Sequence, residues 1–571
     1  MKKKFFSKKF LSMLLASSMV VGSAAALSGC GTKKGDGITT LEVYSQLANF
    51  SGEQTGWSAD VLKEKLGIKI KIVPNNDGVF ETRMEKGSLG DVVVWGADNT
   101  NYPLAVEAGL LFDWEDEGLL DEYGSYIKEN MPDALTKNKE LTKTITNGKS
   151  DALYGFGHNV ALSREDHEAF FYTWDTRWDL YKELGYPKVN NLDDFAKMLK
   201  DMQKICPKDD SGNPVYAVSM WPDWDDAMVM YVKATATAYY GYDELALGLY
   251  DSTTGKYHDA LEKNGPYLEM LRWYNKLFQN DLIDPDSMTQ NYDKMIEKVQ
   301  NGGVLFSIFN YSGQIAFNTK PHTSAGKFMY CMKPEEASPI VYGMNPQGGD
   351  RIWSIGAKTE EPEKAMELIN YLATPEGRMT MEYGPQGVTW DYDDDKHPYF
   401  TELGKKCQAD KQNTQMGGDY KGTYHDGELQ INNSTWSLDA QNPDSNGDTY
   451  NKINWPSENT EAQSAIEQDW RDKTGATNVN TYMQARKFTV QPGTSFSKST
   501  MDNTFKTTWN QVTTCIKTES WKAIYAKTDK EFDSIVAGME KQAKKYGYEE
   551  CKKWSQNEAA RKKSLEDALT K

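Results

Sequence analysis

Residues 58–73 have the sequence SADVLKEKLGIKIKIV, in which a predicted helix leads directly into a predicted strand. Ser58 is the expected N-cap, because a serine hydroxyl can accept hydrogen bonds from the unpaired amides of a first helical turn. Gly67 is the expected end of the helix, since glycine adopts the left-handed backbone that closes many helices. The alternation of lysine and apolar residues over residues 69–73 predicts a strand.

Two further strand-like stretches flank this helix–strand unit. Residues 41–44 precede it, and residues 91–95 (DVVVW) form a short apolar run after it. Strands that alternate with helices at this spacing predict an α/β fold, in which a mostly parallel sheet is covered by helices on both faces. Ligands of such sheets bind beyond the carboxyl ends of the strands, so residues 50–57 and 95–102 are expected to lie beside a cleft.

The composition narrows the class of protein. The chain has 571 residues, with 65 basic and 83 acidic side chains and a net charge of −18. At roughly 100–200 residues per domain, this length predicts two to four domains. The net negative charge argues against a nucleic-acid partner, because proteins bind the phosphate backbone through basic surfaces. The high aromatic content, with 16 Trp, 32 Tyr and 20 Phe, suggests that some rings face a ligand.

The first thirty residues have the anatomy of an export signal. Five lysines lie within residues 2–9, and an uncharged apolar run covers residues 10–27. A retained membrane anchor is the alternative, since this run is nearly long enough to span a bilayer. The sequence Leu-Ser-Gly-Cys that ends at Cys30 resembles the bacterial lipobox. The resemblance implies removal of residues 1–29, lipidation of Cys30, and a lipid-anchored protein on the outer face of the cell membrane of a Gram-positive bacterium.

The other cysteines are expected to be small core residues. None of their spacings is typical of a metal or redox site, and whether any of them pair is left open. They are Cys206, Cys331, Cys407, Cys515 and Cys551.

Further elements are predicted downstream. Strand-like stretches cover residues 170–174, 216–220 and 304–309, and helical patterns cover residues 191–204 and 362–373. Near the C-terminus, Thr528 and Glu531 form a possible capping box ahead of an apolar stripe. Residues 391–480 are rich in Asp, Asn, Gly and Thr, which predicts an irregular, well-solvated insertion on a domain surface.

Several short stretches together resemble extracellular solute-binding proteins of the family 1 type, the receptors that feed sugar-importing ATP-binding-cassette (ABC) transporters. The matching stretches are residues 83–95 (RMEKGSLGDVVVW), residues 149–157 (KSDALYGFG), the LGYP and DDF pieces within residues 184–195, residues 361–377 (EPEKAMELINYLATPEG) and residues 521–539. Their order and spacing cover about residues 40–390 and 515–550. The chain departs from the family pattern in the 391–480 insertion and in having His158 where the family often has proline.

The resemblance implies two α/β lobes of the type II periplasmic-binding-protein kind, which close about a hinge on a bound oligosaccharide. It also implies a monomer without a cofactor, whose partner is the permease of an ABC importer. The expected division is residues 1–29 signal, 30–40 lipidated cysteine and tether, 41–158 and 304–356 first lobe, and 159–303 and 357–571 second lobe with the insertion at about 391–480.

A sugar receptor needs flat aromatic rings for the C–H faces of the sugar, and fixed polar side chains for its hydroxyls. We therefore selected aromatic residues next to polar ones at predicted strand ends, and Phe50 and Gln54 as rim residues. For Trp95 and Asp98 the alternatives are packing under the sheet and capping a helix, and for His158 a structural role. The predicted ligand contacts are Trp57, Trp95, Asp98, Asn99, His158, Asn159, Trp174, Trp221, Asp223, Trp224, Asn310, Tyr311, Trp353 and Trp390.

Catalysis finds little support in the sequence. His167-Glu168 begins a zinc-protease pattern, but Phe171 stands where the second histidine is needed. A calcium site at Asp444, Asn446 and Asp448 lacks the glycine and glutamate positions of a calcium loop, which favours a hydrated turn. A cell-surface carbohydrate-active enzyme and a receptor for peptides or other solutes remain the alternatives. Paired basic residues would favour acidic ligands, and the candidate loops contain no such pair.

Overall fold

The first sheet contains the predicted helix–strand unit. In this computed structural model, which describes residues 37–76, 78–161, 166–432, 438–496 and 498–569, six strands pair in the order β2-β3-β1-β4-β13-β5. β1 pairs in parallel with β3 and β4, whereas β13 pairs antiparallel to β4 and β5. The strands are β1 (Thr39–Ser45), β2 (Gly52–Glu53), β3 (Ile68–Pro74), β4 (Val92–Val94), β5 (Phe156–Gly157) and β13 (Ile352–Ile355).

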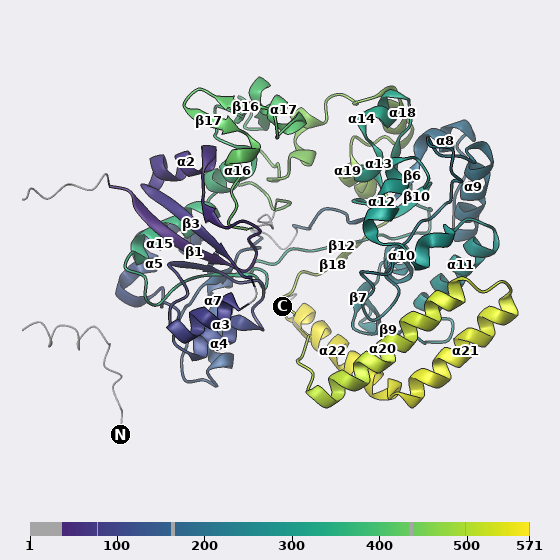
Figure 1. Ribbon diagram of the computed structural model, residues 1–571, viewed down its shortest axis with the longest axis horizontal. Helices are drawn as coiled ribbons and strands as arrows, with labels where there is room; N and C mark the ends of the chain where they lie inside the picture. Colours follow the sequence, from purple (N-terminus) through teal and green to yellow (C-terminus); the bar gives the residue numbers. More distant parts are fainter. Residues whose placement is uncertain (1–36, 77, 162–165, 433–437, 497, 570–571) are drawn as a thin grey trace, which may run out of the picture. The chain divides into compact units, whose positions relative to one another are not determined.

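Each face of this sheet has its own core, because successive side chains of a strand point to opposite faces. Leu41 and Val43 of β1 pack with one cluster, which includes residues of α15. Tyr44, the next residue along, packs with Val93 and Trp95 on the other face. The helices of this lobe are α2 (Gly56–Leu66), α3 (Val79–Lys86), α4 (Asn101–Glu107), α5 (Leu119–Tyr123), α6 (Ser125–Asn130), α7 (Pro132–Ile145), α15 (Pro362–Ala373) and α16 (Pro375–Tyr383) (Figure 1).

The ends of α2 agree only in part with the prediction. Gly67 ends the helix in the left-handed conformation, with φ 64°, and its amide bonds back to Leu62 and Lys63. The helix begins at Gly56, two residues before Ser58, and Thr55 is its N-cap residue. Ser58 is therefore a buried helical residue rather than a cap, because the apolar face of α2 starts at Trp57.

The second lobe is built around a three-stranded sheet in the order β10-β6-β11. β6 (Tyr172–Arg177) pairs antiparallel with both β10 (Phe306–Phe309) and β11 (Met329–Cys331). Parallel pairing in the first sheet covers only β3-β1-β4, since β2, β13 and β5 pair antiparallel with their neighbours, so the expectation of mostly parallel sheets is met only in part. The surrounding helices are α8 (Trp178–Glu183), α9 (Leu192–Ile205), α10 (Met230–Tyr240), α11 (Pro266–Gln279), α12 (Tyr292–Gln300), α13 (Gln314–Phe317) and α14 (Lys320–Ser324).

Three C-terminal helices complete the second lobe. α20 (Asn503–Ile524) packs against α21 (Asp529–Lys545), α22 (Tyr548–Leu569) and α11, and Figure 1 shows the three in yellow. Thr528 is the N-cap of α21, since its side chain accepts a hydrogen bond from the Glu531 amide. The predicted capping box is only half formed, because the Glu531 side chain accepts from the Lys527 amide and not from that of Thr528. None of the helices in the described ranges is long and apolar enough to cross a membrane. The predicted export signal and Cys30 lie outside the described residues.

The chain passes between the two lobes at other points than the sequence predicts. β10 belongs to the second sheet, although residues 304–356 were expected in the first lobe. α15 packs on the first-lobe core, although residues 357–571 were expected in the second. The sequence of a short apolar strand or of an amphipathic helix indicates that the element is buried. It does not indicate which of the two lobe cores buries it. Between the lobes, β12 (Ile340–Tyr342) pairs in parallel with β18 (Thr489–Gln491).

The described parts of residues 391–480, which are 391–432 and 438–480, form a layer that contains helices and strands rather than an irregular surface insertion. They contain β14 (Trp390–Tyr392) in part, β15 (Pro398–Phe400), α17 (Glu402–Ala409), β16 (Gln415–Gly417), β17 (Tyr420–Thr423) and α18 (Ala465–Thr474). Trp57 of α2 donates a hydrogen bond to the Tyr424 carbonyl at 2.9 Å. Trp470 donates to the Cys331 carbonyl of the second lobe, also at 2.9 Å. Trp470 therefore anchors this polar segment to the second lobe, and Trp57 of α2 ties it to the first.

Candidate functional site

Four aromatic rings of the second lobe form a partly exposed surface, which we call the aromatic platform: Phe171, Trp224, Tyr292 and Tyr311. Trp224 is 49% exposed and Phe171 is 41% exposed. The ring of Trp224 stacks on Tyr292 with centroids 4.6 Å apart. Tyr311 lies between the others, with its ring centroid 6.1 Å from that of Trp224 and 5.5 Å from that of Phe171.

The strand pairing brings these rings to one edge of the second sheet. Phe309 at the end of β10 is the register partner of Tyr172 at the start of β6. Tyr311 therefore leaves the sheet where Phe171 enters it. Trp224 reaches the same edge from a loop that Asp225 holds in place, since Asp225 accepts hydrogen bonds from the Met230 amide and the Trp521 indole, both at 2.7 Å. Burial raises the pKa of Asp225 to about 6.

A cavity of about 350 Å³, which we call pocket A, adjoins the platform at Phe171. Its polar lining comes from the strand-end residue Asn310, from the segments that join the lobes, and from the 391–480 layer. The full lining is Asn159, Glu168, Ala169, Phe171, Asn310, Tyr342, Met344, Leu438, Asp439 and Asn451.

The polar groups of pocket A differ in whether they have hydrogen-bond partners within the described protein. Asn159 Oδ1 is buried and has no hydrogen-bond partner among the described residues. Asp439 accepts from the Ala169 amide at 2.9 Å and from Asn451 Nδ2 at 2.8 Å, so both of its oxygens are engaged. Burial raises the pKa of Glu168, and the charge of Asp439 adds to this effect. A ligand hydroxyl that donates to Asn159 would supply the missing partner.

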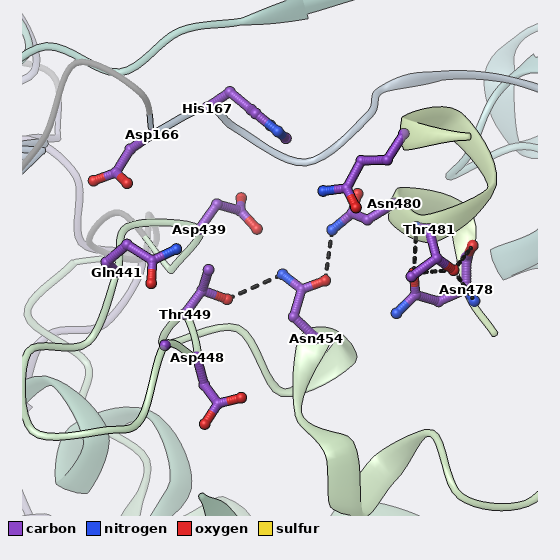
Figure 2. A pocket seen from close by; sticks show the side chains of 12 residues that line it. Asp166, His167, Asp439, Gln441, Asp448, Thr449, Asn454, Asn478, Asn480 and Thr481 are labelled. Carbon is purple, nitrogen blue, oxygen red and sulfur yellow. Dashed lines mark hydrogen bonds between the residues drawn. The ribbon is translucent and has the colours of Figure 1, made fainter. Parts of the chain in front are cut away.

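A second cavity, pocket B, has a volume of about 490 Å³ and an almost wholly polar lining. Figure 2 shows Asp439, Asn454 and Asn480 around one space, with His167 across from them. Asn480 donates to Asn454 Oδ1 at 2.5 Å, and Asn454 donates to Thr449 Oγ1 at 3.0 Å. The lining is Asp166, His167, Asp439, Gln441, Gly447, Asp448, Thr449, Asn454, Asn478, Asn480, Thr481 and Gln484.

Six of the predicted aromatic contacts are buried. Each is at most 1% exposed and lies in a hydrophobic core, although Trp353 also lines a cavity of about 280 Å³. A tryptophan after a strand satisfies the sequence pattern equally well whether it faces the core or the cleft. The six are Trp57, Trp95, Trp174, Trp221, Trp353 and Trp390. Gln54, a predicted rim residue, instead bonds the 391–480 layer through the Glu428 carbonyl and the Gln430 amide, and Phe50 packs at the edge of the first-lobe core.

The predicted polar contacts divide into two groups. Asn159 and Asn310 line pocket A, and Asp223 is exposed next to Trp224. Burial and the nearby Arg351 charge lower the pKa of His158 to about 3, so this fully buried side chain is neutral and structural.

Asp98 and Asn99 lie away from pocket A. Asp98 is 7% exposed, and burial raises its pKa against the opposing charge of Lys137. Asn99 lines a different pocket, together with Asp350 and Lys498. Asp350 also acts on the carboxyl group of Asp98, so the two neighbouring residues share part of their surroundings, and neither belongs to the aromatic platform.

The candidate calcium turn is held by protein hydrogen bonds. Asp448 accepts from Ser445 Oγ at 3.1 Å and lies 2.8 Å from His397 Nδ1. Among the described residues, no cluster of three or more His, Cys, Asp or Glu side chains is placed to hold a metal ion. The donor set at Asp444 and Asn446 therefore gives no support to a metal site in this turn.

Sequence reasoning missed Phe171, Tyr292, Asp439 and Asn451. It searched only the carboxyl ends of strands, but β6 runs antiparallel to β10, so the amino end of β6 lies at the same edge. Phe171 lies within the strand-like stretch of residues 170–174, and this stretch was the available signal for it. Asp439 and Asn451 come from the polar insertion, whose sequence shows no strand or helix pattern that would place them.

Asp175 positions the loop that carries Asn310 and Tyr311. It is fully buried, and its Oδ2 accepts a hydrogen bond from the Gln314 amide at 2.7 Å, at the start of α13. Burial raises the pKa of Asp175 to about 8. The carboxyl group is therefore protonated at neutral pH, and ionising it disfavours the folded state.

We expect Asp175→Asn to flatten the pH dependence of stability. Because the folded pKa is above the ordinary value, the stabilisation is complete below pH 4 and is lost as the pH rises through 8. Each unit of pKa shift corresponds to about 1.4 kcal/mol, so the wild-type free energy of unfolding should fall measurably between pH 6 and pH 8. Urea unfolding of the wild type and of Asp175→Asn between pH 6 and pH 8 measures this fall in stability. Equal slopes for the wild type and the variant would contradict the role of Asp175.

Comparisons with known proteins agree with this two-lobed architecture. The family model of bacterial extracellular solute-binding proteins matches residues 46–379, which is more than half of the chain. A search of curated proteins finds no match. An HMO-binding, ABC-transporter-associated solute-binding protein from Bifidobacterium longum infantis has a similar fold, with 14% identity and a TM-score of 0.57, over 92% of this chain and 99% of that one.

Two proteins of Streptococcus pneumoniae are similar to the same extent. The N-glycan transport solute-binding protein NgtS has 14% identity and a TM-score of 0.52, over 92% of this chain and 99% of that one. The ABC-transporter substrate-binding protein FusA, as an EF-hand mutant with fructo-nystose, has 13% identity and a TM-score of 0.55, over 93% and 99%. At these identities the likeness is one of fold. The family match and the shared fold together show that the chain belongs to the bacterial extracellular solute-binding protein family.

Proposed function

We propose that this chain is the substrate-binding protein of an ABC importer and that it binds an oligosaccharide in pocket A, against the aromatic platform. The family supplies the class of protein. The similar structures are named as solute-binding proteins for HMO, for N-glycan transport and with a bound fructo-nystose. The chain delivers its ligand unaltered, and the permease of the importer is its partner.

The observation that carries the proposal is the pairing of exposed rings with an unsatisfied amide. Trp224 and Phe171 offer flat apolar surfaces to the C–H faces of sugar rings. Asn159 Oδ1 offers a buried acceptor to a sugar hydroxyl, and a sugar that lacks this hydroxyl would leave the amide unpaired. Binding rather than catalysis is favoured, because the family and the similar structures are named as solute-binding proteins.

The N-terminal sequence supports a further part of the proposal, which concerns where the protein is located. A signal over residues 1–29 and lipidation at Cys30 would hold the protein at the outer face of the membrane, with residues 30–40 as a tether. Two or more acyl chains on one residue are sufficient for stable anchoring. Growth with a labelled fatty acid, followed by recovery of the mature protein, tests this, and loss of the label in Cys30→Ser is the expected result.

The binding function is tested by a thermal-shift and calorimetry screen against neutral and acidic oligosaccharides. A ligand at a hundred times its dissociation constant stabilises the folded state by about 2.7 kcal/mol. Recovery of the intact ligand by mass spectrometry supports a receptor, whereas a cleaved ligand supports a carbohydrate-active enzyme. Binding only of peptides would overturn the sugar assignment.

Asn159→Ala should weaken binding about fivefold, because a net hydrogen bond contributes about 1 kcal/mol. The control is Asn130→Ala in α6, an exposed asparagine outside both pockets. It should bind as the wild type does. If Asn159→Ala also binds as the wild type does, Asn159 makes no contact with the ligand.

A further inference from the structure

We propose that pocket B is a second sugar subsite continuous with pocket A, and that the ligand is an uncharged oligosaccharide long enough to occupy both. This inference rests on the function proposed for pocket A. It adds a binding site built by the 391–480 layer and by α19 (Val479–Gln484), and it restricts the chemical class of the ligand.

The two pockets are joined at Asp439, which lines both. The carboxylate is held on one side by the Ala169 amide and on the other by Asn451. Asn451 lines pocket A, whereas Thr449, two residues earlier, lines pocket B. A single short stretch of chain therefore forms the boundary between the pockets, and a linear ligand can contact it from both sides.

The lining of pocket B suits the hydroxyl groups of a sugar. Carboxamides can donate and accept at the same time, which matches a hydroxyl that does the same. Asn454 and Asn480 are already ordered by their mutual hydrogen bond and by Thr449. Gln441 and Gln484 are exposed at the surface of the pocket. Such pre-ordered polar groups bind a ligand without a large entropic cost.

The charges around the pockets select against acidic sugars. The described lining contains the acidic residues Asp166, Glu168, Asp439 and Asp448, and it contains no lysine or arginine. His397 lies beside Asp448, and the described hydrogen-bond donors to Asp439, the Ala169 amide and Asn451, are uncharged. A uronate or sialic acid placed here would meet like charges without a basic partner, and such like-charge contacts suppress wrong ligands.

The size of the combined site also favours an oligosaccharide. The volumes of pocket A (about 350 Å³) and pocket B (about 490 Å³) lie within the range of roughly 300–1,000 Å³ that is typical of small-molecule sites. The aromatic platform lies beside pocket A only, so stacking should fix one end of the ligand. Hydrogen bonds in pocket B should then recognise the units beyond it.

The test uses the purified full-length chain and isothermal titration calorimetry with malto-, cello-, manno- and fructo-oligosaccharides from di- to hexasaccharide. For the series that binds, we expect the wild-type affinity to rise at least tenfold with chain length. The double variant Gln441→Ala/Gln484→Ala should remove most of this gain while its disaccharide affinity stays unchanged. Both side chains are exposed, so the variant should fold normally. Asn413→Ala, in the same layer but outside both linings, is the matched control.

Oligouronates of equal length form the second arm. They should bind the wild type at least tenfold more weakly than the neutral series, and Gln441→Lys should narrow this difference. Equal loss of affinity for short and long ligands, no loss in the double variant, or preferred binding of uronates would each overturn the inference and leave pocket A intact. Failure of every oligosaccharide to bind, at any length, would overturn the proposed function itself.

Discussion

Replacing Trp224 with alanine is expected to lower the affinity for the oligosaccharide by more than tenfold, with little change in the melting temperature of the ligand-free protein. The side chain is 49% exposed, and its ring rests on Tyr292 rather than filling a core. Its removal therefore costs little packing, but it takes away the largest exposed ring of the platform. Truncation of a central tryptophan in an interface commonly costs about 2 kcal/mol or more, and a tenfold loss is about 1.4 kcal/mol.

Calorimetry and thermal unfolding of the same preparations measure both effects. Trp224→Tyr keeps a ring and should recover most of the affinity. Tyr546→Ala is the matched control, because Tyr546 is an exposed aromatic residue, 39% accessible, on the C-terminal helices. Unchanged affinity in Trp224→Ala would show that the ligand does not use the platform.

Trp221→Ala is expected to lower the free energy of unfolding of the ligand-free protein. Three residues away from Trp224, this ring is 0% exposed and is surrounded by the rings of Trp224, Tyr231, Tyr292 and Tyr311. Its loss leaves a large cavity, for which tryptophan-to-alanine changes in cores cost about 3–5 kcal/mol. Urea unfolding without ligand measures this loss. Trp221→Phe should lose less, since it fills part of the space.

The contrast between the two variants is itself informative. Affinity can also fall in Trp221→Ala, because the platform rests on this ring. Its loss of stability should nevertheless be present without any ligand. If Trp221→Ala weakened binding but unfolded at the wild-type urea concentration, the ring would belong to the binding surface and the packing described here would be incorrect.

Elements with a long, amphipathic pattern could be predicted from the sequence. α15 has the predicted bounds, Pro362–Ala373, because proline at the first turn and a repeated apolar face are local signals. In α9, within the helical pattern predicted over residues 191–204, the apolar residues Phe195, Met198, Leu199 and Met202 are buried. The family resemblance rests on such local patterns, and it is confirmed by the family match.

The candidate site was harder to predict, because burial of one tryptophan and exposure of the next depend on the tertiary fold. Trp221 and Trp224 flank the same aspartate and have the same local signals. Both rings contact Tyr292 and Tyr311, and Trp221 also packs on Tyr231 of α10. Asp439 reaches the site through a hydrogen bond from the Ala169 amide, 270 positions away in the sequence, and no local pattern encodes this contact.

The interleaving of the chain also has a consequence for folding kinetics. The first sheet is incomplete until β13 at residues 352–355 is available, and the core of the second lobe needs α20 beyond residue 503. An N-terminal fragment therefore cannot form either lobe, and most of the chain must be synthesised before stable structure appears. Such long-range contacts slow folding. This keeps the chain unfolded for longer, the state in which an exported protein is translocated.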